Sequence, residues 1–370
     1  MKVEVLIYAY LAVCAAMIGF NIACIFVFRV KDKRLDHYSR RFIKIVHQVI
    51  EDQTVTEEHC KYLSKKLKKI NNLMAFDKTL EELFPQNPKQ TKDYIRQLSS
   101  VFTYLTLEYK KKSEIQAAYF PYIIHKYKVF QGQPISIVMD TMLELVHSPS
   151  LYVRENALQA IYSIGSVECT MNALWILNES TYYHHPKMIT DGLLNFSGDT
   201  KQLAERLWDN LHRFSKKMQR VIVDYFRFSS SDHQERILEL LTSHGVDDEV
   251  AYSCIRYLGK YAYPPAYPIL TGIVERYQHN QWIYTAITAS ALASYPGDRT
   301  VAVLKELLHS PNWYVRSNAS QSLMSLGLYY TDMIDVFEGR DRYASEIMRY
   351  RFDQKNMKEK EAVGIGLDSK

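Results

Sequence analysis

One stretch of this chain occurs twice. Residues 144–165 read ELVHSPSLYVRENALQAIYSIG, and residues 306–327, which lie 162 positions later without a gap, read ELLHSPNWYVRSNASQSLMSLG. A similarity of this length within a single chain is typical of repeat architectures. Weaker copies lie between the two, and their second halves end near residues 196, 228, 259 and 295. Six copies separated by five steps give a mean period of about 32 residues, which is enough for two helices and a turn.

The composition favours helices throughout the chain. The 13 Gly and 11 Pro residues are each about 3% of the 370 residues, below the usual shares of about 7% and 5%. So few turn formers argue against an all-β fold and against glycine-rich phosphate loops. Hydrophobic residues make up 47%, which excludes a disordered chain. The five cysteines include no CxxC pair, which excludes zinc-ribbon and thioredoxin-type sites.

The pattern ELLxxPxxxVRxxAxxxLxxLG of the two clear copies resembles the HEAT repeat, including its short bacterial variants. The resemblance covers residues 132–330, although the four middle copies lack the proline or the Val-Arg pair. It implies an all-α fold in which helix pairs stack into a right-handed solenoid. The residues agree with this, because Pro149 and Pro311 stand where a first helix would end. A single pair cannot bury its own apolar face, so neighbouring copies must stack.

Several repeat residues are candidates for binding or for structure. The resemblance implies that Arg154 and Arg316 bridge neighbouring copies, and we predict a structural role for them and for Asn156 and Asn318. Tyrosine is abundant, with 28 residues, and is enriched at protein interfaces. The aromatic candidates for binding a protein partner are Tyr152, Tyr182, Tyr183, Trp313 and Tyr314. Local packing between helices is the simpler interpretation of the rings that lie at inter-helix turns.

A second constraint lies at the N-terminus, where residues 5–28 contain 24 residues without a charge. About 20 apolar residues in a helix cross a bilayer, so this segment is predicted to be a single transmembrane helix. The flank RVKDKR that follows is basic, so the positive-inside rule places the N-terminus outside the cell membrane and the bulk of the chain in the cytoplasm. The rival is a cleaved signal peptide, which would have a basic start and a shorter apolar core.

The region that follows, residues 29–131, is basic and is predicted to be helical, with degenerate repeats as an alternative. Residues 29–130 carry a net charge of +9, whereas residues 131–370 carry −4. Helices are expected from Thr54 or Thr56, over 90–110 and over 114–128. Five lysines are candidates for contact with anionic lipid, the alternative being a solvated helix face: Lys61, Lys65, Lys66, Lys68 and Lys69.

The end of the chain is expected to form a capping helix within 331–352, followed by a flexible tail over 353–370. No HExxH, His-Glu dipeptide, GxSxG, Walker or GxGxxG motif occurs in the sequence. We therefore predict a protein without catalytic residues, cofactor or metal.

The expected function is that of a scaffold that holds a protein partner, itself membrane-embedded, at the cytoplasmic membrane face. The architecture resembles single-span HEAT proteins of bacteria that accompany membrane glycosyltransferases in surface polysaccharide synthesis. Two alternatives remain at this stage. The first is a HEAT-like lyase that attaches a chromophore to cysteine, and the second is a nucleic-acid-binding solenoid. Nucleic acid is disfavoured because the repeat half is acidic.

Overall fold

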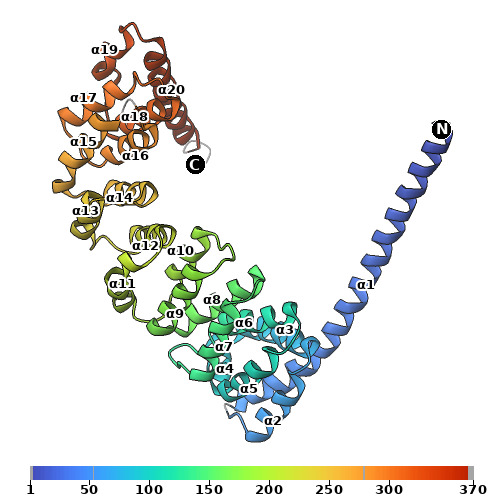
Figure 1. Ribbon diagram of the computed structural model, residues 1–370. Helices are drawn as coiled ribbons and strands as arrows, with labels where there is room; N and C mark the ends of the chain where they lie inside the picture. Colours follow the sequence, from blue (N-terminus) through green and yellow to red (C-terminus); the bar gives the residue numbers. More distant parts are fainter. Residues whose placement is uncertain (1–2, 53, 278–279, 366–370) are drawn as a thin grey trace. The chain divides into compact units, whose positions relative to one another are not determined.

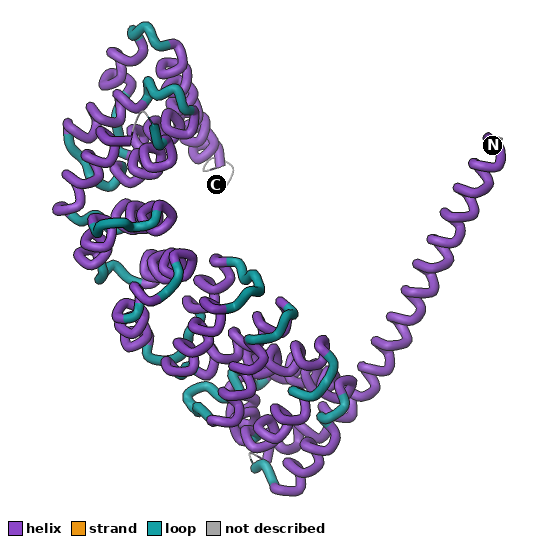
Figure 2. The backbone as a smooth tube through the Cα atoms, viewed as in Figure 1, coloured by secondary structure: helices purple, strands orange, loops and turns teal. Residues whose placement is uncertain are grey.

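The chain is all-α, as the composition and periodicity predict. The computed structural model describes residues 3–52, 54–277 and 280–365. Helices account for 79% of the residues, and no strand occurs in the described part of the chain (Figure 2). The helices form two compact units. One consists of Met1–Tyr183 with Asn195–Gln202, and the other of His184–Leu194 with Leu203–Lys370.

Helix α1 runs unbroken from Val3 to Asp52 (Figure 1). No glycine or proline lies between Phe28 and Asp52, so nothing in the sequence ends the helix after the apolar segment. The helix is long and apolar enough to cross a membrane. Its most apolar window has a mean hydropathy of 2.5, and none of that window is buried against the rest of the described chain. The second part of α1 packs in the first unit, where Phe42 and Val46 are buried.

Eight further helices belong to the first unit: α2 (Glu57–Lys66), α3 (Ile70–Gln86), α4 (Pro88–Gln97), α5 (Ser99–Tyr109), α6 (Glu114–Tyr127), α7 (Ser136–Val146), α8 (Leu151–Ile164) and α9 (Val167–Glu179). Helix α1 packs on α3, α2 packs on α5, and α6 packs on α8. Helix α2 begins after Thr56, one of the two predicted starts, whose hydroxyl accepts a hydrogen bond from the His59 N–H at 3.2 Å.

The single helix predicted over 90–110 is wrong, because the chain forms two helices that part at Leu98. No glycine or proline marks this break. Leu98 is fully buried. Helix α4 packs against α1, while α5 packs against α2 and α7. The break lets each helix follow a different neighbour, which is a tertiary cause that a local pattern does not contain.

The second unit contains the remaining helices: α10 (Pro186–Leu194), α11 (Thr200–Asp209, whose first turn belongs to the first unit), α12 (Lys216–Ser229), α13 (Gln234–Thr242), α14 (Asp248–Lys260), α15 (Tyr267–Tyr277), α16 (Trp282–Leu292), α17 (Asp298–Leu307), α18 (Trp313–Ser325), α19 (Ile334–Phe337) and α20 (Arg342–Ile365). Three short 3₁₀ segments connect them: η1 (Leu211–Arg213), η2 (Pro264–Ala266) and η3 (Tyr330–Met333).

Within the second unit the even-numbered helices form a row in which α10, α12, α14, α16, α18 and α20 each pack on the next. Four of the helices between row members pack on the later one: α13 on α14, α15 on α16, α17 on α18 and α19 on α20. The helices therefore pack in the same order in which successive helix pairs follow one another along the sequence. The row members α10 to α18, and α8 of the first unit, end within three residues of the six helix ends expected from the repeats.

The C-terminal helix is longer than expected. Helix α20 begins at Arg342, and its backbone continues to Ile365 instead of ending at 352. The segment DQKNMKEKEA contains strong helix formers and neither glycine nor proline, so the helix can propagate through it. Of the predicted flexible tail, residues 366–370 lie outside the described residues.

Two helical glycines give a matched test of the packing. A Cβ atom at Gly259 would lie 2.7 Å from the Ala291 Cα and 2.8 Å from the Ala291 Cβ, whereas a Cβ at Gly272 meets nothing within 4 Å. We expect Gly259→Ala to destabilise the chain by about 1–3 kcal/mol, because α14 and α16 must move apart. Gly272→Ala is expected to stabilise it by about 0.5–1 kcal/mol. Denaturant unfolding of both variants measures this, and equal effects would contradict the close approach of α14 and α16.

Candidate functional site

The strongest candidate site is a groove of about 690 Å³ on the first unit, which we call the aromatic groove. Residues of α3, of α6 and of the start of α8 line it: Asp77, Glu114, Ile115, Ala118, Tyr119, Tyr122, Ser150, Tyr152 and Asn156. Helices α6 and α8 pack side by side, and the Asn156 side chain ties them together by donating a hydrogen bond to the Ala118 carbonyl at 2.9 Å. This contact joins α6 and α8 where both helices line the groove.

The groove exposes large apolar side chains. Ile115 is 84% exposed and Tyr152 is 78% exposed, and they stand at the first turns of α6 and α8. The neighbouring Tyr119 and Tyr122 rings lie 5.7 Å apart between centroids. Two large apolar residues that are left so open on the same groove are typical of an interaction surface.

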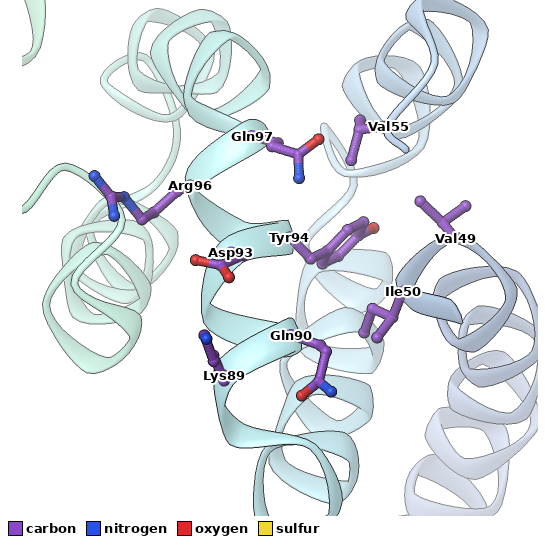
Figure 3. A pocket seen from close by; sticks show the side chains of 9 residues that line it. All are labelled: Val49, Ile50, Val55, Lys89, Gln90, Asp93, Tyr94, Arg96 and Gln97. Carbon is purple, nitrogen blue, oxygen red and sulfur yellow. The ribbon is translucent and has the colours of Figure 1, made fainter. Parts of the chain in front are cut away.

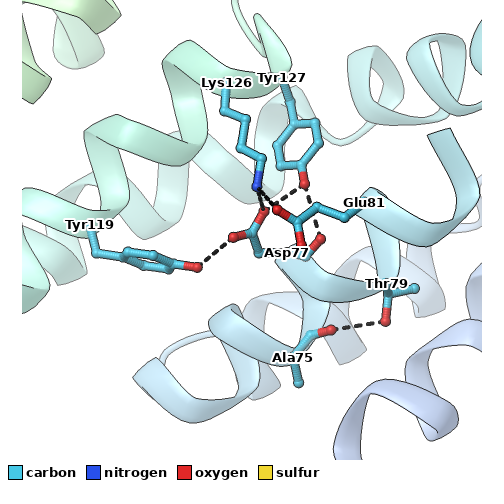
Figure 4. Close-up of polar contacts among 7 residues, drawn as sticks. All are labelled: Ala75, Asp77, Thr79, Glu81, Tyr119, Lys126 and Tyr127. Carbon is cyan, nitrogen blue, oxygen red and sulfur yellow. Dashed lines mark hydrogen bonds and ion pairs between the residues drawn. The ribbon is translucent and has the colours of Figure 1, made fainter. Parts of the chain in front are cut away.

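A buried carboxylate, that of Asp77, belongs to the lining of the groove, and Figure 4 shows its polar contacts. Asp77 is 7% exposed and accepts hydrogen bonds from Tyr119 at 2.6 Å and from Tyr127 at 2.5 Å. The Lys126 ammonium donates to Asp77 at 2.7 Å and to Glu81 at 2.6 Å. Three donors hold the Asp77 carboxylate, and this arrangement fixes the Tyr119 ring in the wall of the groove.

The environment of these donors shifts their pKa values. Burial raises the pKa of Tyr119 and of Tyr127, and their hydrogen bonds to Asp77 raise it further. Burial alone would lower the pKa of Lys126, but the hydrogen bonds to Asp77 and Glu81 outweigh this and raise it. Both phenols therefore stay neutral and Lys126 stays charged near neutral pH. Among the residues that line the groove, Asp77 and Glu114 carry carboxylates and none carries a cation, so the lining is acidic.

The aromatic residues predicted from the sequence are divided between the two units. Tyr152 lies in the aromatic groove, whereas Tyr182 and Tyr183 lie in the connection that follows α9. Trp313 and Tyr314 begin α18 in the second unit, where Tyr314 stacks on Trp282 with centroids 5.3 Å apart. The other lining residues were missed. The spacing of Tyr119 and Tyr122 on one helix was a usable signal, but nothing local pointed to Asp77.

The predicted inter-repeat residues make backbone contacts. The Arg154 guanidinium, 2% exposed, donates to the Ser148 and Pro149 carbonyls at 2.8 Å and to the Tyr183 carbonyl at 2.9 Å. Within the described part of the chain, Arg316 donates only to the Ser310 carbonyl, at 2.6 Å, and its guanidinium lies 5.3 Å from the centroid of the Tyr343 ring. The Asn318 amide donates to the Ala286 carbonyl of α16 at 2.8 Å, which repeats the contact that Asn156 makes with α6.

The predicted lysine surface is partly occupied by other contacts. Lys61 forms an ion pair with Glu57 at 2.7 Å, and Lys68 forms one with Glu108 at 3.4 Å. Lys66 lies over the Tyr62 ring, and Lys68 lies over the Tyr104 ring. Lys65 and Lys69 are exposed. A smaller groove of about 470 Å³ is lined by Lys61, Lys65 and Lys68 together with Tyr104 and Cys60.

A further pocket of about 570 Å³ lies between the end of α1 and α4 (Figure 3). Tyr94, Gln90 and Gln97 face Val49 and Ile50 across it. The charged α4 side chains Lys89, Asp93 and Arg96 point away from these residues. All three charged side chains nevertheless belong to the lining of the pocket. Among the described residues, no group of three or more His, Cys, Asp or Glu side chains is placed to hold a metal ion.

No protein-family model matches the chain, and a search of the curated proteins finds no match.

Proposed function

We propose that this protein is a membrane-anchored scaffold that binds a protein partner through the aromatic groove. The observation that carries the proposal is α1. Its apolar part is not buried against any described part of the chain, and the same helix continues without a break into the unit that bears the groove. Apolar side chains that are exposed along a helix of this length can be buried in the hydrocarbon core of a bilayer. Tethering then raises the concentration of the groove near a membrane partner without new contacts.

The proposed orientation follows from the charges that flank the span. Arg29, Lys31, Lys33 and Arg34 come directly after the apolar segment, so the folded units are placed in the cytoplasm. Residues 29–52 extend about 36 Å as a helix, so a perpendicular α1 would hold the end that leads into α2 that far from the bilayer. Electrostatic attraction to lipid is screened within about 10 Å. The lysines of α2 would therefore add to membrane binding only where α1 leans towards the surface.

We further propose that the helix pairs form a HEAT-like solenoid. The row of packed even-numbered helices in the second unit supports this, as does the repeated Asn-to-carbonyl contact of Asn156 and Asn318. Repeat arrays offer an extended surface and each repeat contacts only its neighbours. Such an array suits a scaffold better than an enzyme.

The groove indicates the chemistry of the partner. Ile115 and Tyr152 offer apolar contact, and the carboxylate of Glu114 lies beside them. A protein segment that presents an aliphatic or aromatic side chain next to a lysine or arginine fits both features. We propose that the partner is membrane-embedded. A membrane glycosyltransferase of surface polysaccharide synthesis is the class that the resemblance to bacterial single-span HEAT proteins suggests.

Site-specific photo-crosslinking of the full-length chain in cells tests the groove. A photoreactive residue at position 152 is expected to give an adduct with one membrane protein, because Tyr152 stands on the groove. The same residue at position 329 is the control, since Tyr329 is 72% exposed but lies in the second unit. Glu114→Lys is expected to lower the yield at position 152 by reversing the rim charge. Equal adducts from both positions, or none from position 152, would contradict the proposal.

A further inference from the structure

A cluster of arginines on α12 and α14 carries more positive charge than its neighbours neutralise. Arg220, Asp224 and Arg227 follow one another at helical spacing on α12 and therefore share a face. Helix α14 packs on α12, and it contributes Glu249, Arg256 and Lys260. The Arg220 guanidinium donates to Glu249 at 2.7 Å, and the Lys260 ammonium donates to the Arg227 carbonyl at 2.9 Å. These two contacts set the register of the helices, and Arg256 lies close enough to Asp224 for the two charges to interact.

The Asp224 carboxylate of this cluster is shared between two arginines. The Arg227 guanidinium approaches Asp224 Oδ1 at 3.2 Å, and Arg220 Nε approaches Asp224 Oδ2 at 3.8 Å. Neither distance yields a hydrogen bond of good geometry. The Nε atoms of Arg220 and Arg227 are buried without a hydrogen-bond partner in the described part of the chain, and so is the acceptor Asp224 Oδ1. Buried donors of this kind are rare in folded proteins and call for a ligand or water.

Arg256 has no partner of its own. Among the described residues it makes neither a hydrogen bond nor an ion pair. Burial lowers its pKa, and the positive charges of Arg227 and Arg220 lower it further, against the opposing effect of Asp224 and Glu249. Its guanidinium thus lies half-buried among like charges. Counting Lys260, four cations face two carboxylates, so a dianion would balance the cluster.

We propose that Arg220, Arg227 and Arg256 bind a phosphate group between α12 and α14. The planar fork of a guanidinium matches phosphate oxygens, and several arginines around one dianion are a common arrangement. Phe228 is exposed beside the cluster. The Arg227 guanidinium lies 4.5 Å from the centroid of its ring and the Lys260 ammonium lies 5.5 Å from it, so an apolar part of the ligand would find a surface there. This site is independent of the aromatic groove and of the proposed scaffold function.

Thermal unfolding of the detergent-solubilised full chain, with inorganic phosphate as the probe, tests the site. Phosphate is expected to raise the melting temperature above that in sodium chloride of equal ionic strength. Arg256→Gln is expected to weaken phosphate binding at least about tenfold, the loss of one charge-assisted hydrogen bond. The same change should leave the melting temperature without phosphate unchanged or higher, because it removes an unpaired charge from the protein. Arg299→Gln, an exposed arginine paired with Glu275, is the control and should keep the phosphate effect.

The possible results distinguish a phosphate-binding role of Arg256 from a purely structural role. If phosphate raises the melting temperature of the native chain and of the Arg256→Gln variant equally, the proposed site is wrong. It is also wrong if the variant without phosphate unfolds at a lower temperature than the native chain. A second arm adds phosphatidic acid to the detergent micelles. Stabilisation by this lipid that is lost in Arg256→Gln would keep the phosphate chemistry and place the group on a lipid, whereas stabilisation by inorganic phosphate alone places it on a soluble molecule.

Discussion

Two arginines placed in the apolar part of α1, as Ile18→Arg with Ile22→Arg, are expected to move this protein from the membrane to the soluble fraction. Both side chains are exposed in the structure, so the substitutions break no packing within the described chain. An arginine near the centre of a span costs about 2.5–3.5 kcal/mol on translocon-insertion scales. Two of them in a single helix therefore remove most of the drive for insertion. Carbonate extraction of membranes followed by immunoblotting measures the change.

The control for this experiment is Tyr38→Arg, which puts one arginine on an exposed position of α1 beyond the apolar segment. It is expected to leave the protein in the membrane. The intact mass of the native protein in the membrane fraction separates an anchor from a cleaved signal peptide, which would leave a shorter chain. A soluble native protein of full length would overturn the membrane anchor.

Replacing Arg154 by alanine is expected to be the most damaging single change in the first unit. It removes three hydrogen bonds and leaves the Ser148, Pro149 and Tyr183 carbonyls without this donor. Because these groups are partly buried, we expect a loss of about 3–4 kcal/mol in the free energy of unfolding. The equivalent change Arg316→Ala removes one backbone hydrogen bond at a more open position, and about 1 kcal/mol is expected. Thermal and denaturant unfolding of both variants give the comparison.

Partner binding extends this test. If Arg154 is structural, the crosslink from position 152 in Arg154→Ala should weaken only as far as the folded fraction falls. Loss of the crosslink at unchanged stability would mean that Arg154 contacts the partner. Equal destabilisation by Arg154→Ala and Arg316→Ala would show that the repeat position, and not the burial of the individual residue, sets the energy.

The sequence predicted the helix boundaries well where the determining residues lie close to the boundary. The start of α2 at Thr56 and the ends of the repeat helices follow from capping residues and from apolar periodicity, which act within one or two turns. Glycine at a helix end is an example, since Gly165 caps α8 with a φ of 83°. The break at Leu98 and the extension of α20 to Ile365 were missed. The first depends on which neighbours α4 and α5 meet, and the second on the propagation of a helix without a stop signal.

The sequence alone determined that the chain is helical, that it repeats, and that one apolar segment is long enough to span a bilayer, because each of these depends on residues close together in the chain. Only the tertiary structure decided which side chains meet. Asp77 meets Tyr119 and Tyr127 across more than forty residues, and Arg220 meets Glu249 through the packing of α12 on α14. Such meetings depend on how neighbouring helices are placed along one another, which no local periodicity encodes.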